Sequence, residues 1–398
     1  MITYEFSEEQ EMLRESVREF FASKITPRVP EMEKKEEIPL DIMHAMGEME
    51  LLCCTADPEY GGSGFDAVTA GIVGEELGRA DYTASTAVFY LVQASWAHVF
   101  NKYGTHECKQ KWIPPAAKGD GFIGIATTES NIGSDLGNMV TTIKPDGDKY
   151  VVNGEKNYIS GVREVKQYGG GHVTLGRQTK ESGTRGMTMF FLPLQQDGID
   201  ITVDREMGRE AISTGGFHID NVEIPKENLI GEENKGFYIV HEGYELARGI
   251  IAAVCCGAAM KSIENGIKYI KERKTFGKPI GKYEGIQFPL AENYTRISML
   301  RDWAYKSLHM IDLEQQGKAD RMEVSKHIAM AKMFCSTWAM QAIDDVMQWQ
   351  GAFGYNKECP DQAAYRAVRS FTLAEGSKEI MKTIVARELL GKDFIAYK

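Results

Sequence analysis

Apolar residues recur at helical spacing along the first part of the chain. Leu13, Val17 and Phe21 fall on one face of a helix, and residues 7–10, Ser-Glu-Glu-Gln, have the pattern of a capping box at its start. The same spacing predicts further helices, over residues 41–52, 66–80, 84–103 and 105–117. We therefore expect residues 1–120 to form a helical N-terminal domain.

The pattern changes between residues 121 and 231, where short apolar runs alternate with turn-forming residues. Runs of this length bounded by glycine or proline are typical of strands. The pair Asn153-Gly154 lies between two apolar runs and predicts a hairpin turn. We expect a small antiparallel barrel or sandwich, with strands over residues 122–126, 187–192, 199–203 and 217–224.

Helical spacing returns after residue 232. The long apolar-periodic segments cover residues 235–272, 285–317, 321–350 and 361–391. Segments of this length with short connections favour a four-helix bundle over residues 232–398. The expected fold class is therefore α+β and multidomain, with a β domain between two helical domains.

One glycine motif matches a nucleotide site by its letters only. Gly62, Gly64 and Ala67 fit the loose dinucleotide fingerprint, but Asp57-Pro58 precedes them and helices are expected on both sides. The fingerprint requires a strand in front and a βαβ unit around it. The segment is therefore expected to be a turn between two helices.

Composition and charge exclude several classes of protein. The 398-residue chain has a formal net charge of −11, which argues against binding to nucleic-acid phosphates but leaves room for a small anionic ligand in a basic pocket. The seven cysteines, with neighbours at 53–54 and 255–256, are typical of reduced thiols in a cytoplasmic protein. Cysteine and histidine spacings predict no metal site, and no uninterrupted apolar run approaches the roughly 18 residues of a membrane span.

A glutamate followed by a glycine near the C-terminus is the candidate catalytic group. Glu375 precedes Gly376 at the start of a helix-forming stretch, and a carboxylate at a glycine bend can point toward a ligand. Taken alone the pair is weak evidence, because most of the 57 acidic residues are expected to be solvated surface. Three motifs accompany it: Thr-Thr-Glu-Ser-Asn-Ile-Gly-Ser-Asp at 127–135, Arg-Lys-Thr-Phe-Gly at 273–277 and Gln-Trp-Gln-Gly-Ala at 348–352.

These motifs, in this order, resemble those of the acyl-CoA dehydrogenase family of flavoproteins over essentially the whole chain. The family has a helical N-terminal domain, a middle β domain and a C-terminal four-helix bundle. The resemblance implies FAD as cofactor and α,β-dehydrogenation of an acyl-CoA thioester. It also implies that Glu375 takes the α-proton while the β-hydrogen leaves as hydride, and that the Glu375 amide N–H bonds the thioester carbonyl. Burial should raise the pKa of this glutamate toward the working pH.

The resemblance also assigns residues to the FAD site. Tyr158 and Ser160 stand where the family has tryptophan and threonine, Ala352 replaces a glycine, and Glu284 replaces a glutamine. Taken alone, the motifs favour a strand-entry turn, a packed core aromatic and, at Arg273, a basic helix end. The expected FAD contacts are Thr127, Thr128, Gly133, Ser134, Tyr158, Ser160, Arg273, Thr275, Phe276, Gln348, Gly351, Ser377 and Glu379.

A second set of residues is implied for the substrate. Ala247 stands where some relatives carry the base, which favours Glu375 in that role. Ala374 stands where relatives commonly have tyrosine, so our hypothesis is a cyclic, branched or aryl-substituted acyl group. An intrahelical pair of Glu245 with Arg248 is an alternative to a substrate contact. The expected substrate contacts are Ser134, Tyr90, Leu91, Glu245, Arg248, Ala374 and Gly376.

The implied partners are an acyl-CoA substrate, an electron-transferring flavoprotein as acceptor, and further copies of the chain. In relatives the segment 273–277 reaches the FAD of a neighbouring subunit, so a homo-oligomer, expected to be a tetramer, follows from the resemblance. An acyl-CoA oxidase or an enoyl-CoA reductase on the same scaffold is an open alternative. A flavin-free scaffold protein is a further alternative from another class, and it would have no use for Glu375, Arg273 and Thr128 together.

Overall fold

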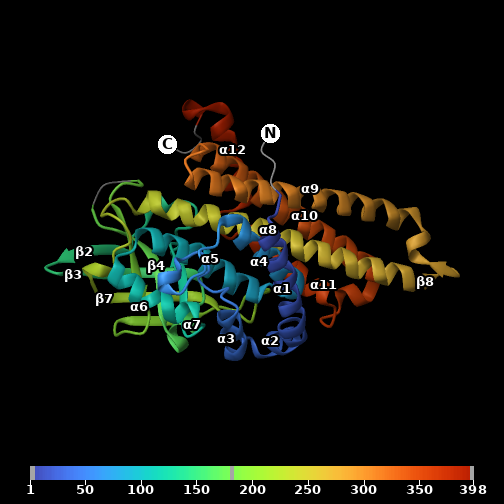
Figure 1. The fold of residues 1–398 in the computed structure, drawn as a ribbon, viewed down its shortest axis with the longest axis horizontal. Helices are drawn as coiled ribbons and strands as arrows, with labels where there is room; N and C mark the ends of the chain where they lie inside the picture. The colour runs from blue at the N-terminus through green and yellow to red at the C-terminus, as the bar shows by residue number, and fades with distance from the viewer. Residues whose placement is uncertain (1–4, 180–182, 395–398) are drawn as a thin grey trace.

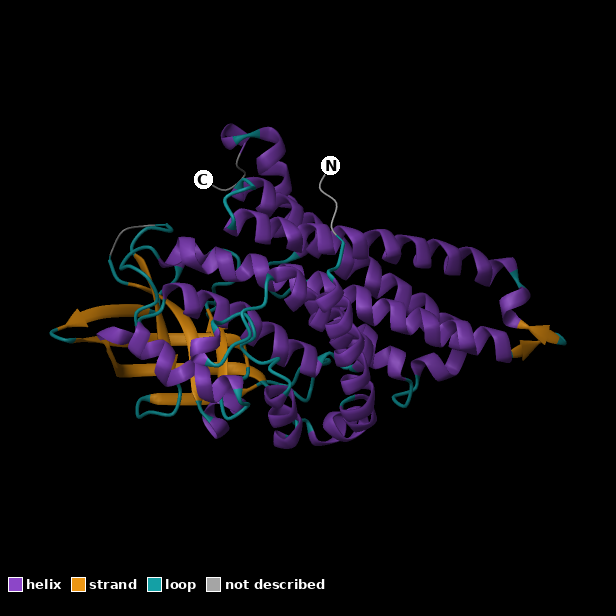
Figure 2. Cartoon of the chain, in the orientation of Figure 1, coloured by secondary structure: helices purple, strands orange, loops and turns teal. Residues whose placement is uncertain are grey.

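The computed structural model describes residues 5–179 and 183–394, so the outermost residues of the first and last expected domains lie outside it. The chain runs from helices through a β sheet to a helical bundle, which confirms the expected fold class (Figures 1 and 2). Ser7 and Gln10 cap each other reciprocally, as the capping box predicts. The N-terminal helices are α1 (Glu8–Lys24), α2 (Val29–Lys35), α3 (Leu40–Glu48), α4 (Ala67–Ala80), α5 (Ser85–Tyr103) and α6 (His106–Ala117).

The β domain is one mixed sheet and not an entirely antiparallel one. Its strand order is β1-β4-β2-β3-β7-β6, with β5 on β4, and β1 runs parallel to β4 from the pair Phe122–Gly170 onward. The short helix α7 (Val162–Tyr168), absent from the expected elements, turns the chain before β4. The strands are β1 (Phe122–Ala126), β2 (Thr142–Asp146), β3 (Lys149–Ser160), β4 (Gly170–Arg177), β5 (Met187–Pro193), β6 (Ile199–Val203) and β7 (Thr214–Pro225).

The hairpin expected at Asn153-Gly154 is wrong, because both residues lie inside β3. The turn is at Gly147 (φ 64°), between the paired ends of β2 and β3. Gly154 instead marks a register shift against β7, and a Cβ there would lie 2.7 Å from Thr141. Glycine therefore serves close approach of two backbones here, a role that has the same sequence signal as a turn.

The C-terminal bundle differs from the expected one in its last helix. The segment 361–391 is two helices, because Glu375 (φ 54°) and Gly376 (φ 96°) adopt left-handed backbone that cannot continue a helix. At the other end of the bundle, β8 (Lys274–Thr275) and β9 (Lys278–Pro279) form a small hairpin. The helices are α8 (Gly236–Glu272), α9 (Glu284–Gln315), α10 (Arg321–Gln350), α11 (Pro360–Phe371) and α12 (Lys378–Leu390).

Helix α8 is the core helix of the molecule. The helix is long and apolar enough for a membrane span, because its most apolar 18-residue window has a mean hydropathy of 1.5. However, 89% of that window is buried inside the fold. It packs against α4 and α5 on one side and α9 and α10 on the other. Burial among these helices accounts for its composition.

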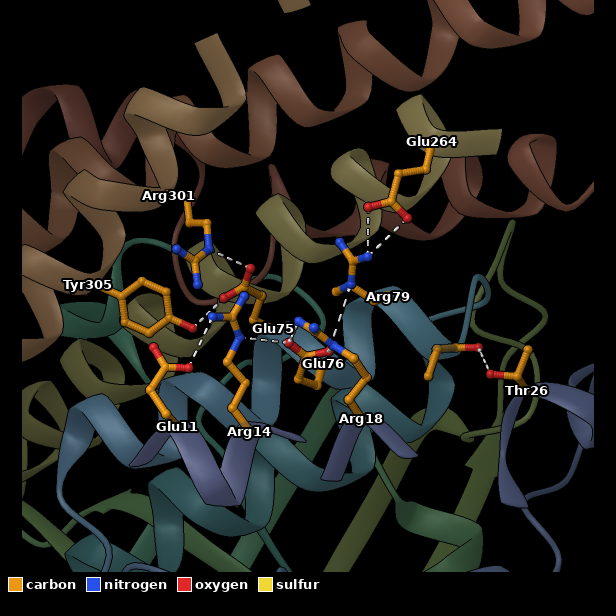
Figure 3. Close-up of polar contacts among 11 residues, drawn as sticks. Glu11, Arg14, Arg18, Thr26, Glu75, Glu76, Arg79, Glu264, Arg301 and Tyr305 are labelled. Atoms are coloured by element: carbon orange, nitrogen blue, oxygen red, sulfur yellow. Dashed lines mark hydrogen bonds and ion pairs between the residues drawn. The ribbon is translucent and has the colours of Figure 1, made fainter. Parts of the chain in front are cut away.

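Charged residues join the N-terminal helices to the bundle (Figure 3). The carboxylate of Glu76 in α4 accepts hydrogen bonds from Nε and Nη2 of Arg18 in α1, at 2.8 and 2.6 Å. Glu75, the next residue, accepts Arg301 of α9 at 2.6 Å and the hydroxyl of Tyr305 at 2.5 Å. Two adjacent glutamates therefore connect α4 to α1 and to α9.

Candidate active site

The turn between α11 and α12 carries Glu375 and Gly376. The Lys378 amide donates to the Thr372 carbonyl at 3.0 Å, and Ser377 accepts the Ile380 amide at 3.4 Å, which closes the turn and caps α12. A non-glycine residue in left-handed backbone costs about 1–2 kcal/mol. Contacts from elsewhere must therefore stabilise the conformation of Glu375.

Two buried cations supply those contacts. Arg248 of α8, 4% exposed, donates from Nε to the carbonyl of Glu375 at 2.7 Å. Lys332 of α10, 0% exposed, donates from Nζ to the carbonyl of Gly376 at 2.5 Å. The two long core helices thus each hold one carbonyl of the turn through a charge-assisted hydrogen bond.

The carboxylate of Glu375 is left without such bonds. Although the residue as a whole is half-buried, its Oε2 atom is inaccessible and has no hydrogen-bond partner among the described residues. Burial raises the pKa of Glu375 to about 7, against the opposing charges of Arg248 and Lys332. A carboxylate with one inaccessible, unbonded oxygen and a pKa near neutrality is suited to general-base catalysis.

Tyr244 connects this turn to the β domain. Its hydroxyl and the Thr127 Oγ1 are 2.6 Å apart, and its ring lies 5.2 Å from the Arg248 guanidinium. Burial, together with the charge of Glu375, raises the pKa of Tyr244. Trp96 of α5 packs edge-on against the same ring at 5.6 Å. The structure therefore brings Thr127 and Glu375 into one neighbourhood.

An ion pair and a backbone hydrogen bond join the loop after β1 to β3. Glu129 accepts the amides of Val140 and Thr141 at 2.8 and 2.9 Å, and forms a buried ion pair with Lys156 at 3.0 Å. The Asn157 amide donates to the Thr128 carbonyl at 2.9 Å. These contacts fix the backbone of the loop, whereas the sequence-predicted residues Gly133 and Ser134 are exposed.

Tyr158 is the residue after Asn157 on β3 and is unusual in two ways. It has positive φ (57°) and is 65% exposed, although it is a large aromatic residue. Strained backbone and an exposed ring are both features found at ligand sites. Ser160, two residues on, is half-buried, so these two predicted FAD residues lie beside the loop that carries Thr127 and Thr128.

Five of the remaining predicted FAD residues form a second group at the far end of the bundle, where Figure 1 shows β8 opposite the sheet. Arg273 ends α8, about 37 Å along the axis from Arg248 at about 1.5 Å per residue. The Tyr269 hydroxyl reaches the Gln350 carbonyl at 3.3 Å, which joins the ends of α8 and α10. Phe276 is 94% exposed. One chain therefore does not bring this group to Glu375; its members are Arg273, Thr275, Phe276, Gln348 and Gly351.

The predicted substrate residues are placed in different surroundings. Glu245 forms its ion pair with Arg321 of α10, at 3.2 Å. Ala374 is half-buried beside Glu375, and its amide donates to Ser370. Tyr90 and Leu91 are buried in the N-terminal helices, where the Tyr90 hydroxyl donates to the Ala70 carbonyl at 2.9 Å. Two predicted FAD residues lie close to Glu375 instead of at the far end of the bundle: Ser377 caps α12, and Glu379 is exposed at its first turn.

Two residues of the site were missed by the sequence reading. Lys332 had a signal, because it is a lone lysine among alanines and methionines on a helix expected to face the core. Tyr244 had none, since an aromatic at that position is equally typical of a packed core.

Comparison with known proteins identifies the family. Models of the acyl-CoA dehydrogenase N-terminal, middle and C-terminal domains match residues 7–120, 124–222 and 234–390. The chain is 31% identical to the 3-(aryl)acrylate reductase of Clostridium sporogenes, over 97% of this chain and 99% of that one. It is 27% identical to the cyclohexane-1-carbonyl-CoA dehydrogenase of Geobacter metallireducens, over 96% and 98%. The solved butyryl-CoA dehydrogenase of Megasphaera elsdenii has a TM-score of 0.90 at 26% identity, covering 98% of this chain and 100% of that one. The chain belongs to the acyl-CoA dehydrogenase family of oxidoreductases.

Proposed function

We propose that the protein dehydrogenates an acyl-CoA thioester to the 2-enoyl-CoA, with FAD as cofactor and Glu375 as the base. The observation that carries the proposal is the buried Oε2 of Glu375, which has no hydrogen-bond partner among the described residues and belongs to a group with a pKa of about 7. Such an oxygen is free to accept a proton from carbon-2 of a substrate.

The Glu375 backbone supports the same role. Among the hydrogen bonds of the described residues, none uses the amide N–H of Glu375 as donor. An amide free to donate can bond a thioester carbonyl, on which negative charge develops as the α-proton leaves. Arg248 bonds the carbonyl of the same residue, which belongs to the next peptide unit, so this contact leaves the N–H unused.

The residues around Tyr158 fit a flavin. The exposed ring of Tyr158 offers a stacking face, and the hydroxyls of Ser134, Thr128 and Ser160 offer hydrogen-bond donors, next to Thr127, which is buried against Tyr244. FAD, when bound, supplies the acceptor for the β-hydrogen as hydride. This chain would hold it through those residues, Gly133, Ser377 and Glu379.

We further propose that the far group serves another subunit. Arg273, Thr275, Phe276, Gln348 and Gly351 are too distant from Glu375 to act on the same cofactor, and the ring of Phe276 is almost wholly exposed. A guanidinium such as that of Arg273 suits a pyrophosphate, because its fork pairs two oxygens. The expected assembly is a homotetramer, and Arg273→Ala should lower FAD retention on gel filtration without dissociating the subunits.

The acyl group is proposed to be cyclic, branched or aryl-substituted. Ala374 leaves space beside Glu375, and two relatives at 31% and 27% identity are named for an aryl acrylate and a cyclohexane thioester. A panel of acyl-CoA thioesters tests this, with anaerobic bleaching of the flavin as readout. Cyclohexanecarboxyl-CoA or an aryl-propanoyl-CoA should bleach faster than butyryl-CoA or hexanoyl-CoA, and the reverse order would refute the proposal. The variant Ala374→Tyr should lose the bulky substrates first.

A second candidate function is enoyl-CoA reduction, which the aryl acrylate reductase relative favours. The same Glu375 would then donate its proton to carbon-2, by microscopic reversibility. Incubating photoreduced enzyme with an aryl-acryloyl-CoA and following flavin reoxidation compares the two directions. Reoxidation of the substrate-reduced flavin in air, with and without an electron-transferring flavoprotein, separates an oxidase from a dehydrogenase that uses that partner. A colourless protein that does not take up FAD would indicate a scaffold.

A further inference from the structure

Lys332 is a buried lysine whose place in the fold has no obvious structural need. It lies near the middle of α10, is 0% exposed, and directs Nζ to the carbonyl of Gly376 at 2.5 Å. A buried ammonium group is costly unless it is bonded. The acceptor here is a backbone carbonyl of the turn between α11 and α12, so the ammonium group stabilises that turn.

Lys332 and Arg248 hold successive carbonyls of the Glu375–Gly376 turn from different helices. Both carbonyls belong to residues with positive φ, the conformation that aims the Glu375 side chain. The fit is close, because a Cβ on Gly376 would lie 3.4 Å from Arg248 Nη2 and 3.0 Å from Met381 Cε. Each cation bonds a carbonyl, and the Oε2 atom of the carboxylate that must stay reactive has no hydrogen-bond partner among the described residues.

We propose that Lys332 is a positioning residue for Glu375: its bond to the Gly376 carbonyl holds the turn that aims the carboxylate, and its charge favours the ionised form of the base. The proposal rests on the function proposed for Glu375. It assigns Lys332 no contact with the reacting atoms.

The electrostatic part involves the charged and titratable groups that shift the pKa of this ammonium most. These are Arg248 and Cys255 of α8, Glu375 in the turn, and Glu379 of α12. Burial, followed by the charge of Arg248, lowers the pKa of Lys332 to about 7, the same range as that of Glu375. Because the charge of each group shifts the pKa of the other, the acid limb of a rate profile depends on both. Without the cation, Glu375 loses an interaction that favours its charged form.

The test compares FAD-loaded wild type with Lys332→Met and Lys332→Arg. We expect Lys332→Met to lower kcat about tenfold or more with KM within about threefold, because a base misplaced by ~1 Å loses much of its rate. The acid limb of its kcat/KM profile should move up by about 0.5–1 pH unit. Lys332→Arg, which keeps the charge, should return the limb toward the wild-type position.

Hydrogen exchange gives a readout that does not depend on turnover. The amides of Leu373, Ala374 and Lys378 are bonded within the turn. We expect them to exchange faster in substrate-free Lys332→Met. The control is Lys326→Met, which removes a lysine from the same helix whose partner is Glu323; it should change neither the turn nor the pH profile.

A folded Lys332→Met with unchanged exchange in the turn and an unmoved acid limb would overturn the proposal. If Lys332→Met does not fold, Lys332→Gln, which keeps a hydrogen-bond donor, takes its place with the same expected shift in the acid limb. Failure of both variants to fold would also overturn it, in favour of a purely structural role. A wild-type protein without dehydrogenase or reductase activity refutes the proposed function instead, and the exchange experiment still shows whether Lys332 holds the turn.

Discussion

Two glutamates that lie beside arginines, Glu75 and Glu375, have pKa values shifted in opposite directions. Glu75, at the junction of α4 and α9, is bonded through its carboxylate by Arg301 and Tyr305 (Figure 3). Burial alone would raise the pKa of Glu75, but these bonds outweigh it and the pKa is lowered. Glu375 is half-buried beside an arginine with its Oε2 atom inaccessible, and its pKa is raised to about 7.

The difference lies in which atoms the cations bond. Around Glu75 the donors point at the carboxylate, so the charged form is favoured and both carboxylate oxygens accept hydrogen bonds. Around Glu375 the donors of Arg248 and Lys332 point at backbone carbonyls, so the cations fix the turn and leave an oxygen unbonded. The same residue types therefore make a structural junction in one place and a reactive base in the other.

Replacing the reactive carboxylate tests the comparison most directly. Glu375→Gln should lower kcat about 10³-fold, because a positioned general base contributes about 10²–10⁴ to the rate. FAD content and binding of a non-reacting acyl-CoA analogue should be retained, as absorbance and titration would show. Near-normal turnover by this variant would refute the assignment.

The matched change in the structural glutamate should act on stability instead. Glu75→Gln removes the carboxylate charge that Arg301 bonds at 2.6 Å, which costs about 3 kcal/mol in the free energy of unfolding. Thermal or urea unfolding measures the loss, while kcat per FAD of the folded fraction should stay within about twofold. A variant of full stability with poor turnover would break the contrast between the two sites.

A methyl group at Gly376 sharpens the comparison from the backbone side. Gly376→Ala places a Cβ at positive φ (96°), 3.0 Å from Met381, so we expect a loss of about 1–2 kcal/mol in stability and about a tenfold fall in kcat. Gly147→Ala is the control, because Gly147 also has positive φ (64°) but lies in an open turn. It should lose stability with unchanged kcat; equal losses of kcat in both variants would exclude a specific effect on the base.

The smallest expected effect is the dependence on pH, which separates the two glutamates without mutation. Glu375 must be ionised, so kcat/KM should rise with pH to a plateau above about 7 and be about tenfold lower at pH 6. The folded pKa of Glu75 lies below 4.5, so its contribution to stability is present above pH 4.5 and is lost as the pH falls through the folded value. Unfolding temperatures at pH 6 and 7.5 serve as the check: if activity and stability fell together, Glu375 would not be the titrating group.

Much of the molecule could be predicted locally. The capping box at Ser7, the strand at Phe122–Ala126 and the length of α10 follow from periodicity and from neighbours within a few residues, and the structure confirms them. The motif residues around Thr127 and Glu375 were likewise recognisable, because a motif is a property of adjacent positions. The role of Asn153-Gly154 was not, since a turn and a close approach need the same residue.

The sequence by itself therefore determined the order of helices and strands and the candidate base. Only the tertiary structure decided that the last helix breaks at Glu375, that Arg248 and Lys332 bond the carbonyls of the break, and that Arg273 lies far from it. The rest of α10, helix α11 and the turn after it separate Lys332 from Gly376 in the sequence. The only indication of a role for Lys332 in the sequence is that it is polar where the core is expected. Which backbone oxygen it reaches is set by how α10 packs against α8 and α12, and no local pattern encodes that contact.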